Sequence, residues 1–365
     1  DGASGKDGCD CQLFLDLPAP STWSELPAAA TLDGNGVLAA GHTQAANGFA
    51  DGWLHAVSAE GKVLWDKVVE KPGIDKFDGI ARGPNGTYVA VGGTTSAGAG
   101  KLDGWLVLFD ATGKVLADKT VGGGEDDLLL DVQALPGGGW VAAGYSFSGS
   151  KGENDGWLVG VDANLQLQWE HRQGSTFDDQ FGGVAIVGWG ATARALAVGY
   201  RTLTTSGGLK RDEMVTVVEA NGAIATGKDG KPLQYFYDRA TGYNGVNSAF
   251  DELNGIDRLA NGGAVAIGRA EAGTLSAPLV ARFDAAGEKV SDTAVPKKVA
   301  GEFPNSATLF DVVALADGGA VAMGMAAAGA GTPIGWPWFM RLSAQDTKVW
   351  QRHGIAGPAG AIRLE

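Results

Sequence analysis

The sequence has almost no cysteine, because its 365 residues contain only Cys9 and Cys11, and a disulfide framework across the chain is therefore excluded. Long apolar runs are also missing, since no stretch approaches the roughly 18 to 20 residues that span a bilayer. Basic charge is scarce: 28 Lys and Arg stand against 42 Asp and Glu, which gives a formal net charge of −14. Because the basic residues are dispersed, nucleic acid and anionic membrane surfaces are poor partners.

Glycine is abundant instead. The chain has 59 Gly together with 44% hydrophobic residues, so it combines many turns with enough apolar side chains for a core. No segment shows the apolar period of a helix. The composition therefore favours a protein of many short strands, and a chain of this length requires a search for internal repeats.

One unit of about 50 to 70 residues recurs six times. Each copy carries a glycine at the end of an apolar run, at Gly41, Gly92, Gly144, Gly199, Gly268 and Gly324. A second block follows each glycine: Asp51-Gly-Trp-Leu, Asp103-Gly-Trp-Leu, Asp155-Gly-Trp-Leu, and weaker versions at Asp212-Glu-Met-Val, Ala277-Pro-Leu-Val and Trp336-Pro-Trp-Phe. Three copies are well preserved and three have diverged.

Each unit reads as four short strands separated by turn residues. In the third unit we expect strands at 130–135, 140–146, 156–162 and 165–172, with hairpins at Asx-Gly and Gly-Gly pairs. Four antiparallel strands per repeat predict an all-β fold, a six-bladed β-propeller of four-stranded antiparallel blades over residues 21–360. Residues 23–31 would supply the first strand of blade one and 348–353 the last strand of blade six. Extra residues at 227–245 predict an extended outer hairpin and loop in blade four.

These motifs resemble the bacterial extracellular propeller repeats of the delta-60 and SBBP type. The resemblance runs from about residue 28 to 354 and rests on Asp-Gly-Gly-x-hydrophobic-x-Ala-Gly followed by Asp-Gly-Trp-Leu. It implies a secreted or surface-displayed β-propeller. It implies no catalytic motif, because those families share none.

Trp53, Trp105 and Trp157 fall at one position of the repeat, where the other copies have Met214, Leu279 and Trp338. Since every substitute is large and apolar, we expect this position to pack between neighbouring blades. The tryptophans of the last strands, Trp65, Trp169 and Trp350, are candidates either for exposed stacking or for sealing the gaps between blades.

Aspartates recur in two registers. One set opens the third strand of the unit and the other precedes the first strand: Asp51, Asp103, Asp155 and Asp212, and Asp75, Asp127, Asp179 and Asp251. In an up-and-down blade both sets lie on one face of the ring. They are candidate ligand- or ion-binding residues, and a Ca²⁺ site at Asp127 and Asp179 is one reading, since Ca²⁺ needs six to eight oxygens. The alternative is that each aspartate accepts hydrogen bonds from its own loop.

Evidence for catalysis is sparse. His42, His55, His171 and His353 show no metal-ligand spacing, and no nucleophile motif occurs. A carboxylate pair acting as acid and base stays open as an alternative, with residues 125–127 (Glu-Asp-Asp) as its most crowded candidate. We therefore name no catalytic residue and expect a protein without enzymatic activity.

Residues 1–20 are expected to form a leader or tether. Gly2, Gly5 and Gly8 fall at every third residue, as at the end of a collagen-like stalk, with a flexible hydrophilic leader as the alternative. Cys9 and Cys11 could close a disulfide, cross-link neighbouring chains or bind a soft metal, and we expect a disulfide at the tether of an exported protein. A lipid anchor in a preceding segment would be the membrane tether.

The sequence thus predicts a binding or scaffold module, secreted or on the outer surface of a bacterium. Its acidic loop face would recognise an extracellular protein or polysaccharide. One alternative is a hydrolase or lyase acting on glycans at the mouth of the channel. The other is a structural propeller stabilised by Ca²⁺.

Overall fold

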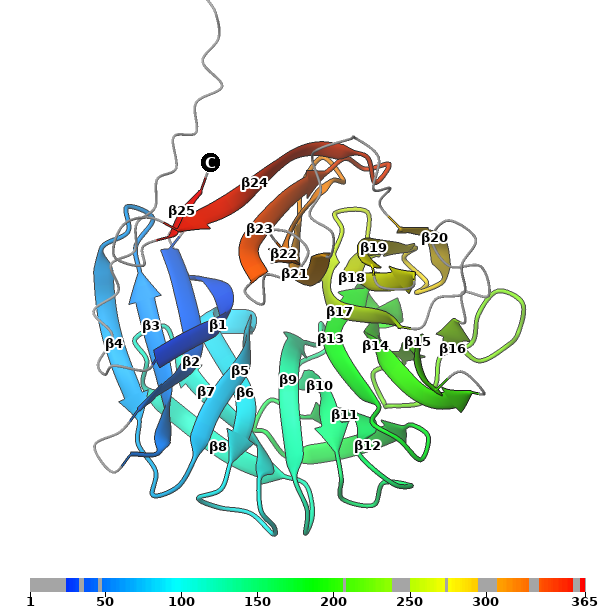
Figure 1. The fold of residues 1–365 in the computed structure, drawn as a ribbon. Coiled ribbons are helices and arrows are strands. Elements are labelled where there is room, and N and C mark those ends of the chain that lie inside the picture. The colour runs from blue at the N-terminus through cyan, green and yellow to red at the C-terminus, as the bar shows by residue number, and fades with distance from the viewer. Residues whose placement is uncertain are drawn as a thin grey trace, which may run out of the picture.

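A computed structural model describes residues 24–32, 36–44, 48–205, 208–237, 250–272, 275–294, 307–327, 335–356 and 362–364. These residues form six antiparallel sheets arranged around a central axis, and two single-turn 3₁₀ helices, Pro84–Gly86 and Gly190–Thr192, are the helical segments described (Figure 1). The prediction of a six-bladed β-propeller with four-stranded blades is confirmed. Cys9, Cys11 and the leader at residues 1–20 lie outside the described residues.

The strands of each blade follow one another along the chain. Blade one contains β1 (Ser24–Leu32), β2 (Gly36–Gln44), β3 (Ala50–Val57) and β4 (Val63–Val69). Blade two contains β5 (Asp75–Arg82), β6 (Thr87–Thr94), β7 (Asp103–Asp110) and β8 (Val115–Val121). Blade three contains β9 (Asp127–Ala134), β10 (Trp140–Ser146), β11 (Asp155–Val161) and β12 (Leu167–Gln173).

The remaining blades keep this order. Blade four contains β13 (Gln180–Val187), β14 (Arg194–Thr205), β15 (Gly208–Val218) and β16 (Gln234–Tyr237). Blade five contains β17 (Asp251–Arg258), β18 (Ala264–Ala272), β19 (Leu275–Phe283) and β20 (Lys289–Ala294). Blade six contains β21 (Ala307–Ala314), β22 (Ala320–Ala327), β23 (Gly335–Leu342), β24 (Lys348–Ala356) and a fifth strand, β25 (Ile362–Leu364). The first strand of each blade lies innermost (Figure 1).

The repeated glycine has a steric reason. A Cβ at Gly92 on β6 would collide with the Lys76 carbonyl and lie 2.8 Å from the Cα of Phe77 on the inner strand, and Gly144 meets β9 in the same way. The inner strand approaches so closely because it carries a β-bulge at this level, as the register shift between Phe77 and Gly79 shows. The same shift occurs in the innermost strand of each of the other five blades.

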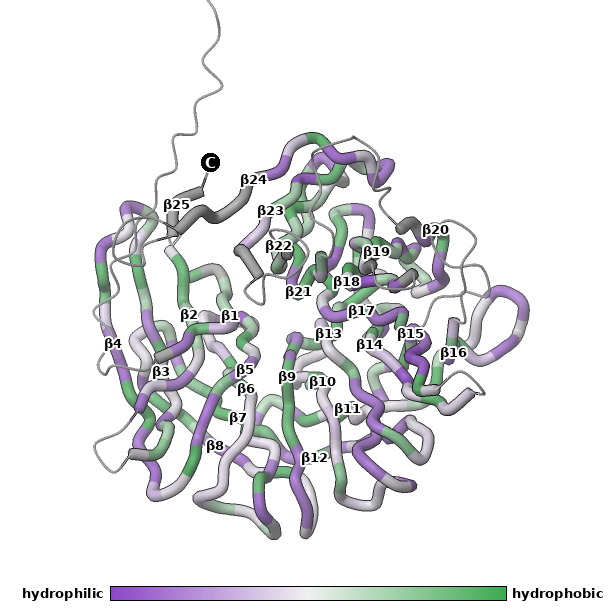
Figure 2. Tube along the Cα trace, in the orientation of Figure 1, coloured by the Kyte–Doolittle hydropathy of each residue, from purple (hydrophilic) through white to green (hydrophobic). Residues whose placement is uncertain are grey.

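Apolar side chains fill the interfaces between blades, which we call seams. Five core clusters each join two consecutive blades, from blades one and two to blades five and six. Figure 2 shows hydrophobic stretches on strands of every blade. The repeated tryptophan position is buried in all six copies, which confirms its predicted packing role: Trp53, Trp105, Trp157, Met214, Leu279 and Trp338.

Two of the outer-strand tryptophans also seal seams. The indole N–H of Trp65 donates to the Ala111 carbonyl of the next blade at 3.0 Å, and Trp169 donates likewise to Ala220 at 3.0 Å. Both rings pack against the cluster of their seam. Trp350 on β24 is exposed.

The sixth seam, between blade six and blade one, is packed differently. On β2, Val37 is 43% exposed, although its counterparts Tyr88 and Trp140 are buried. On blade six, Met323 is 40% and Val313 is 56% exposed, whereas Val91, the counterpart of Met323, is fully buried. Innermost strands pack closely at the other five seams, and within the described ranges no comparable packing joins β21 to β1. In Figure 1, β24 and β25 extend toward blade one.

The extra residues of blade four form part of the predicted hairpin. A tight turn joins Gly227 to Lys231, where the Gly227 N–H donates to the Lys231 carbonyl at 2.8 Å. Leu233 returns to the sheet through its carbonyl, which accepts from Val217 N–H at 2.9 Å. The outer strand β16 follows, and residues 238–249 lie outside the described part.

Candidate functional site

The repeated aspartates meet at one end of the ring. In blade two Asp75 lies opposite Thr94, and Thr94 lies opposite Asp103, while in blade three Asp127, Ser146 and Asp155 form the same row. Both acidic sets therefore open toward the loops that enter the first and third strands of the blades. We call the surface of these loops the loop face. All eight aspartates of the two sets are buried, at most 3% exposed.

Asp127 illustrates the hydrogen bonds that these buried carboxylates accept. It accepts hydrogen bonds from Ser146 Oγ at 2.5 Å, Ser148 Oγ at 2.7 Å and the Gly123 N–H at 2.7 Å. Its partners belong to two different loops, so one side chain fixes both. Asp75 likewise accepts from Thr94 Oγ1 and from Ser96 Oγ, the latter at 2.7 Å.

Three further loop aspartates have comparable partners. Asp103 accepts from the Gly100 N–H at 3.1 Å, Asp51 from the Lys71 N–H at 3.2 Å, and Asp179 from the Ser175 and Thr202 N–H groups. Burial raises the pKa of Asp51 and of Asp179. Asp212 instead forms ion pairs, at 3.1 Å with Arg201 and 3.3 Å with Lys210.

Five of the eight loop aspartates thus act as internal hydrogen-bond acceptors that hold the loops: Asp51, Asp75, Asp103, Asp127 and Asp179. Within the described residues no group of three or more His, Cys, Asp or Glu side chains is placed to hold a metal ion. Ligand or Ca²⁺ binding by the predicted set, including the pair Asp127 and Asp179, stays a prediction.

The Glu-Asp-Asp triplet at 125–127 is also tied into the loop face. Glu125 forms an ion pair with Lys101 at 2.6 Å, and Asp126 accepts from the Leu102 N–H at 3.1 Å. The three carboxylates therefore contact different partners, and this arrangement does not itself define an acid–base pair.

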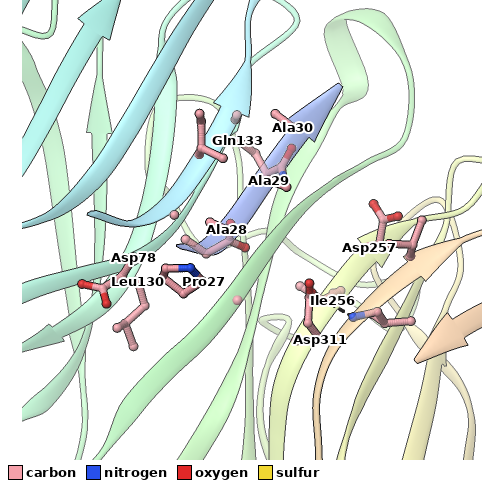
Figure 3. Close-up of a pocket in the computed structure, with 18 of the residues that line it drawn as sticks. Pro27, Ala28, Ala29, Ala30, Asp78, Leu130, Gln133, Ile256, Asp257 and Asp311 are labelled. Carbon is pink, nitrogen blue, oxygen red and sulfur yellow. Dashed lines mark hydrogen bonds between the residues drawn. The ribbon is translucent and has the colours of Figure 1, made fainter. Parts of the chain in front are cut away.

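A cavity of about 960 Å³ occupies the central channel. The innermost strands of all six blades line it, and it extends to the sixth seam, where Val37 of β2 and Phe310 of β21 contribute. Four aspartates lie on its walls: Asp78, Asp131, Asp257 and Asp311. In Figure 3, Asp257 and Asp311 lie near each other, and Asp78 lies on the other side of Ala28.

Asp131 links two blades across the channel wall. Its carboxylate accepts from the Val132 N–H of its own strand at 2.7 Å and from the Val184 N–H of β13 at 2.8 Å. Burial raises the pKa of this carboxyl to about 7, with a further contribution from the charges of Asp311 and Asp257. Asp131 therefore joins two blades through its hydrogen bonds, and its carboxyl titrates near neutrality.

Asp257 repeats this arrangement between blades five and six, because it accepts from the Arg258 N–H at 2.7 Å and the Ala314 N–H at 2.8 Å. Asp311 occupies the position of Asp131 and accepts from its own Val312 N–H at 2.8 Å. The next blade after Asp311 is blade one, across the sixth seam. Burial raises the pKa of both carboxyls.

Sequence reasoning did not find the channel aspartates. They lie on the innermost strands, three to six residues after the repeated loop position, and no single column of the repeat contains all four. The one available signal was a charged residue inside a strand whose neighbours are apolar, such as Asp131 before Val132.

No protein-family model matches the chain, and no curated protein matches it significantly. Solved structures do match, among them an α-L-arabinofuranosidase from Fusarium graminearum, 10% identical with a TM-score of 0.50 over 90% of this chain and 96% of that one. Sqt1 of Chaetomium thermophilum bound to the N-terminus of ribosomal protein L10 is 11% identical, with a TM-score of 0.47 over 93% and 94% of the chains.

The β-propeller domain of the trilobed protease from Pyrococcus furiosus is 8% identical, with a TM-score of 0.42 over 94% of this chain and 96% of that one. At these identities the likenesses concern the fold alone. The chain is a β-propeller of six blades. Across the part of the chain that the structure describes, no helix has the length and apolar character to cross a membrane.

Proposed function

We propose that this β-propeller is a non-enzymatic binding or scaffold module, related to the delta-60 and SBBP type of repeat and displayed at a bacterial cell surface. Its loop face would recognise an extracellular protein or glycan. The observation that supports this proposal is the use of the buried aspartates, because Asp75 and Asp127 hold exposed loops in defined positions. Rigid loops on a β-scaffold suit recognition, since little conformational entropy is lost on binding.

Apolar side chains are exposed at several of these loops. Ile74 precedes β5 and is 43% exposed, Phe147 follows β10 and is 37% exposed, and Leu209 lies at the tip of the β14–β15 hairpin. Aromatic side chains are typical of the energetic centre of an interface, and exposed aliphatic side chains add apolar area that binding can bury. We therefore expect Ile74 and Phe147 to contact the partner.

The test measures binding to purified envelope proteins and polysaccharides with Ile74→Ser and Phe147→Ser variants. Loss of a contact residue should weaken binding by roughly tenfold or more. Leu116→Ser is the matched control, because Leu116 is 47% exposed on the outer strand β8. Equal binding by all three variants, or no binding to any component, would remove the loop face from the proposal.

A glycan-active hydrolase or lyase is the second candidate, supported by the channel cavity and by an Asp131 carboxyl whose pKa of about 7 suits acid–base exchange. Turnover of a polysaccharide panel that Asp131→Asn abolishes would establish it. Absence of turnover across the panel, or turnover that survives both Asp131→Asn and Asp311→Asn, would count against it.

A further inference from the structure

Two buried carboxylates meet across the seam between blades three and four. Asp155 opens β11, and Asp179 immediately precedes β13. A Cβ at Gly174 would collide with Asp155 Oδ1 and lie 2.7 Å from Asp179 Oδ2, so both carboxylates face the point beside this glycine. Two like charges therefore share one small site, which the absence of a side chain at residue 174 leaves open.

One of these oxygens has no donor. Asp155 is 2% exposed, and its Oδ1 is buried without a hydrogen-bond partner. Neither Asp155 nor Asp179 forms an ion pair with another described residue. A buried carboxylate oxygen without a partner is unfavourable, because it has lost its water and gained nothing in exchange. This site is therefore suited to a cation in direct contact with Asp155 Oδ1, a contact that no neighbouring side chain makes.

Blade four supplies positive charge at the equivalent position from its own side chains. Asp212 occupies the position of Asp155 in blade four, and there Arg201 and Lys210 lie 3.1 and 3.3 Å from its carboxylate. The positions equivalent to Arg201 and Lys210 in blade three hold Ser146 and Glu153. The protein thus forms direct ion pairs with the carboxylate at one seam, whereas in the preceding blade Lys151 and Arg172 act on Asp155 only from a longer distance.

We propose that Asp155 and Asp179 bind a Ca²⁺ ion between blades three and four. Ca²⁺ takes oxygen ligands in irregular geometry and completes its shell of six to eight with main-chain oxygens and water, so two carboxylates suffice as its charged ligands. The ion would neutralise the pair and join the third strand of one blade to the first strand of the next. Ca²⁺ binding at this site requires no partner at the loop face.

The test uses the full chain, freed of metal with a chelator and titrated with Ca²⁺ alone, while calorimetric binding and the melting temperature are followed. Ca²⁺ should bind the wild type and raise its melting temperature, because an ion that binds only the folded state stabilises it. Asp155→Asn and Asp179→Asn should lose both effects. Asp103→Asn is the matched control, because the Asp103 carboxylate already accepts from the Ala99 and Gly100 N–H groups.

Glu153→Lys keeps the proposal testable if the aspartate variants do not fold. It places in blade three the lysine that blade four has at Lys210, and Glu153 is exposed. This variant should melt higher than the metal-free wild type and should no longer respond to Ca²⁺. A wild type that shows no response at millimolar Ca²⁺, or an undiminished response in Asp155→Asn or Glu153→Lys, would overturn the proposal.

Discussion

The five seams from blade one to blade six and the sixth seam, which joins blade six back to blade one, use the same repeat positions with different results. Tyr88 and Val91 are buried at their seams, whereas their counterparts Val37 and Met323 at the sixth seam are about 40% exposed. The residue types are similarly apolar in both cases. The difference therefore lies in how closely the blades approach, and it shows that repeated sequence does not ensure equal packing around a closed ring.

The largest difference in unfolding free energy is expected when a core side chain and a side chain of the sixth seam are each replaced by alanine. Trp105→Ala should cost about 4 kcal/mol of unfolding free energy, because it leaves a large cavity where the indole stacks on Phe77 at 4.7 Å. Val37→Ala at the sixth seam should cost less than about 1 kcal/mol, since part of this side chain is already in water. Urea denaturation of the two variants measures both values. A Val37→Ala loss of about 2 kcal/mol or more would show that the sixth seam is closely packed in solution.

The next largest difference in unfolding free energy is expected between two aspartates of the channel wall, Asp131 and Asp311. Asp131→Ala removes the acceptor of the Val132 and Val184 N–H groups and should cost roughly 3 kcal/mol. Asp311→Ala removes the acceptor of Val312 alone, so we expect a loss of roughly 1 kcal/mol. Denaturant unfolding of both variants makes the comparison, and a larger loss for Asp311 would mean that it bridges the sixth seam.

The pH dependence of the unfolding free energy should reveal the titration of the Asp131 carboxyl. The pKa of the Asp131 carboxyl is about 7 in the folded protein and near 4 when unfolded, so the folded state binds the extra proton between these values. Stability from this group is full below about pH 4 and is lost as pH rises through 7, by roughly 2 kcal/mol because the side chain is only partly buried. Asp131→Asn should remove this slope, and Glu153→Gln should keep it. A slope unchanged in Asp131→Asn would assign the titration elsewhere.

The smallest difference in unfolding free energy is expected when one small group is added to an innermost strand. Gly79→Ala places a Cβ 2.7 Å from the Leu130 carbonyl and should cost about 1.5 kcal/mol at the seam between blades two and three. Ala28 already fills the equivalent position in blade one, and Ala28→Ser should change stability by less than about 0.5 kcal/mol. Thermal unfolding of the two variants suffices. A tolerated Gly79→Ala would mean that the inner strands separate easily.

Much of the fold was predictable because the turn glycines and the large apolar position recur from blade to blade. Glycine pairs mark the hairpins, and a large apolar side chain at the Trp105 position of every copy marks the core, so strand order and the buried tryptophan position followed from the sequence. In the third unit the second strand was expected at 140–146 and occurs there, while the first begins three residues earlier than expected, at Asp127. That end depends on loop hydrogen bonds that no apolar pattern encodes.

The sites were less predictable for physical reasons. The loop aspartates were placed on one face, but their burial depends on which Ser and Thr side chains reach them. Asp131 was missed because its role depends on a β-bulge, which shifts the register by one residue and turns the carboxylate toward the next blade. The exposure of Val37 and Met323 leaves no trace in the sequence, since their counterparts are equally apolar.

Hydrogen exchange of the main-chain amides tests the difference between the seams most directly. The amides of β1, β2, β21 and β22, which flank the sixth seam, should exchange sooner than those of β9, β10, β13 and β14 around the seam between blades three and four. Equal protection of the two sets, or slower exchange beside the sixth seam, would contradict the account.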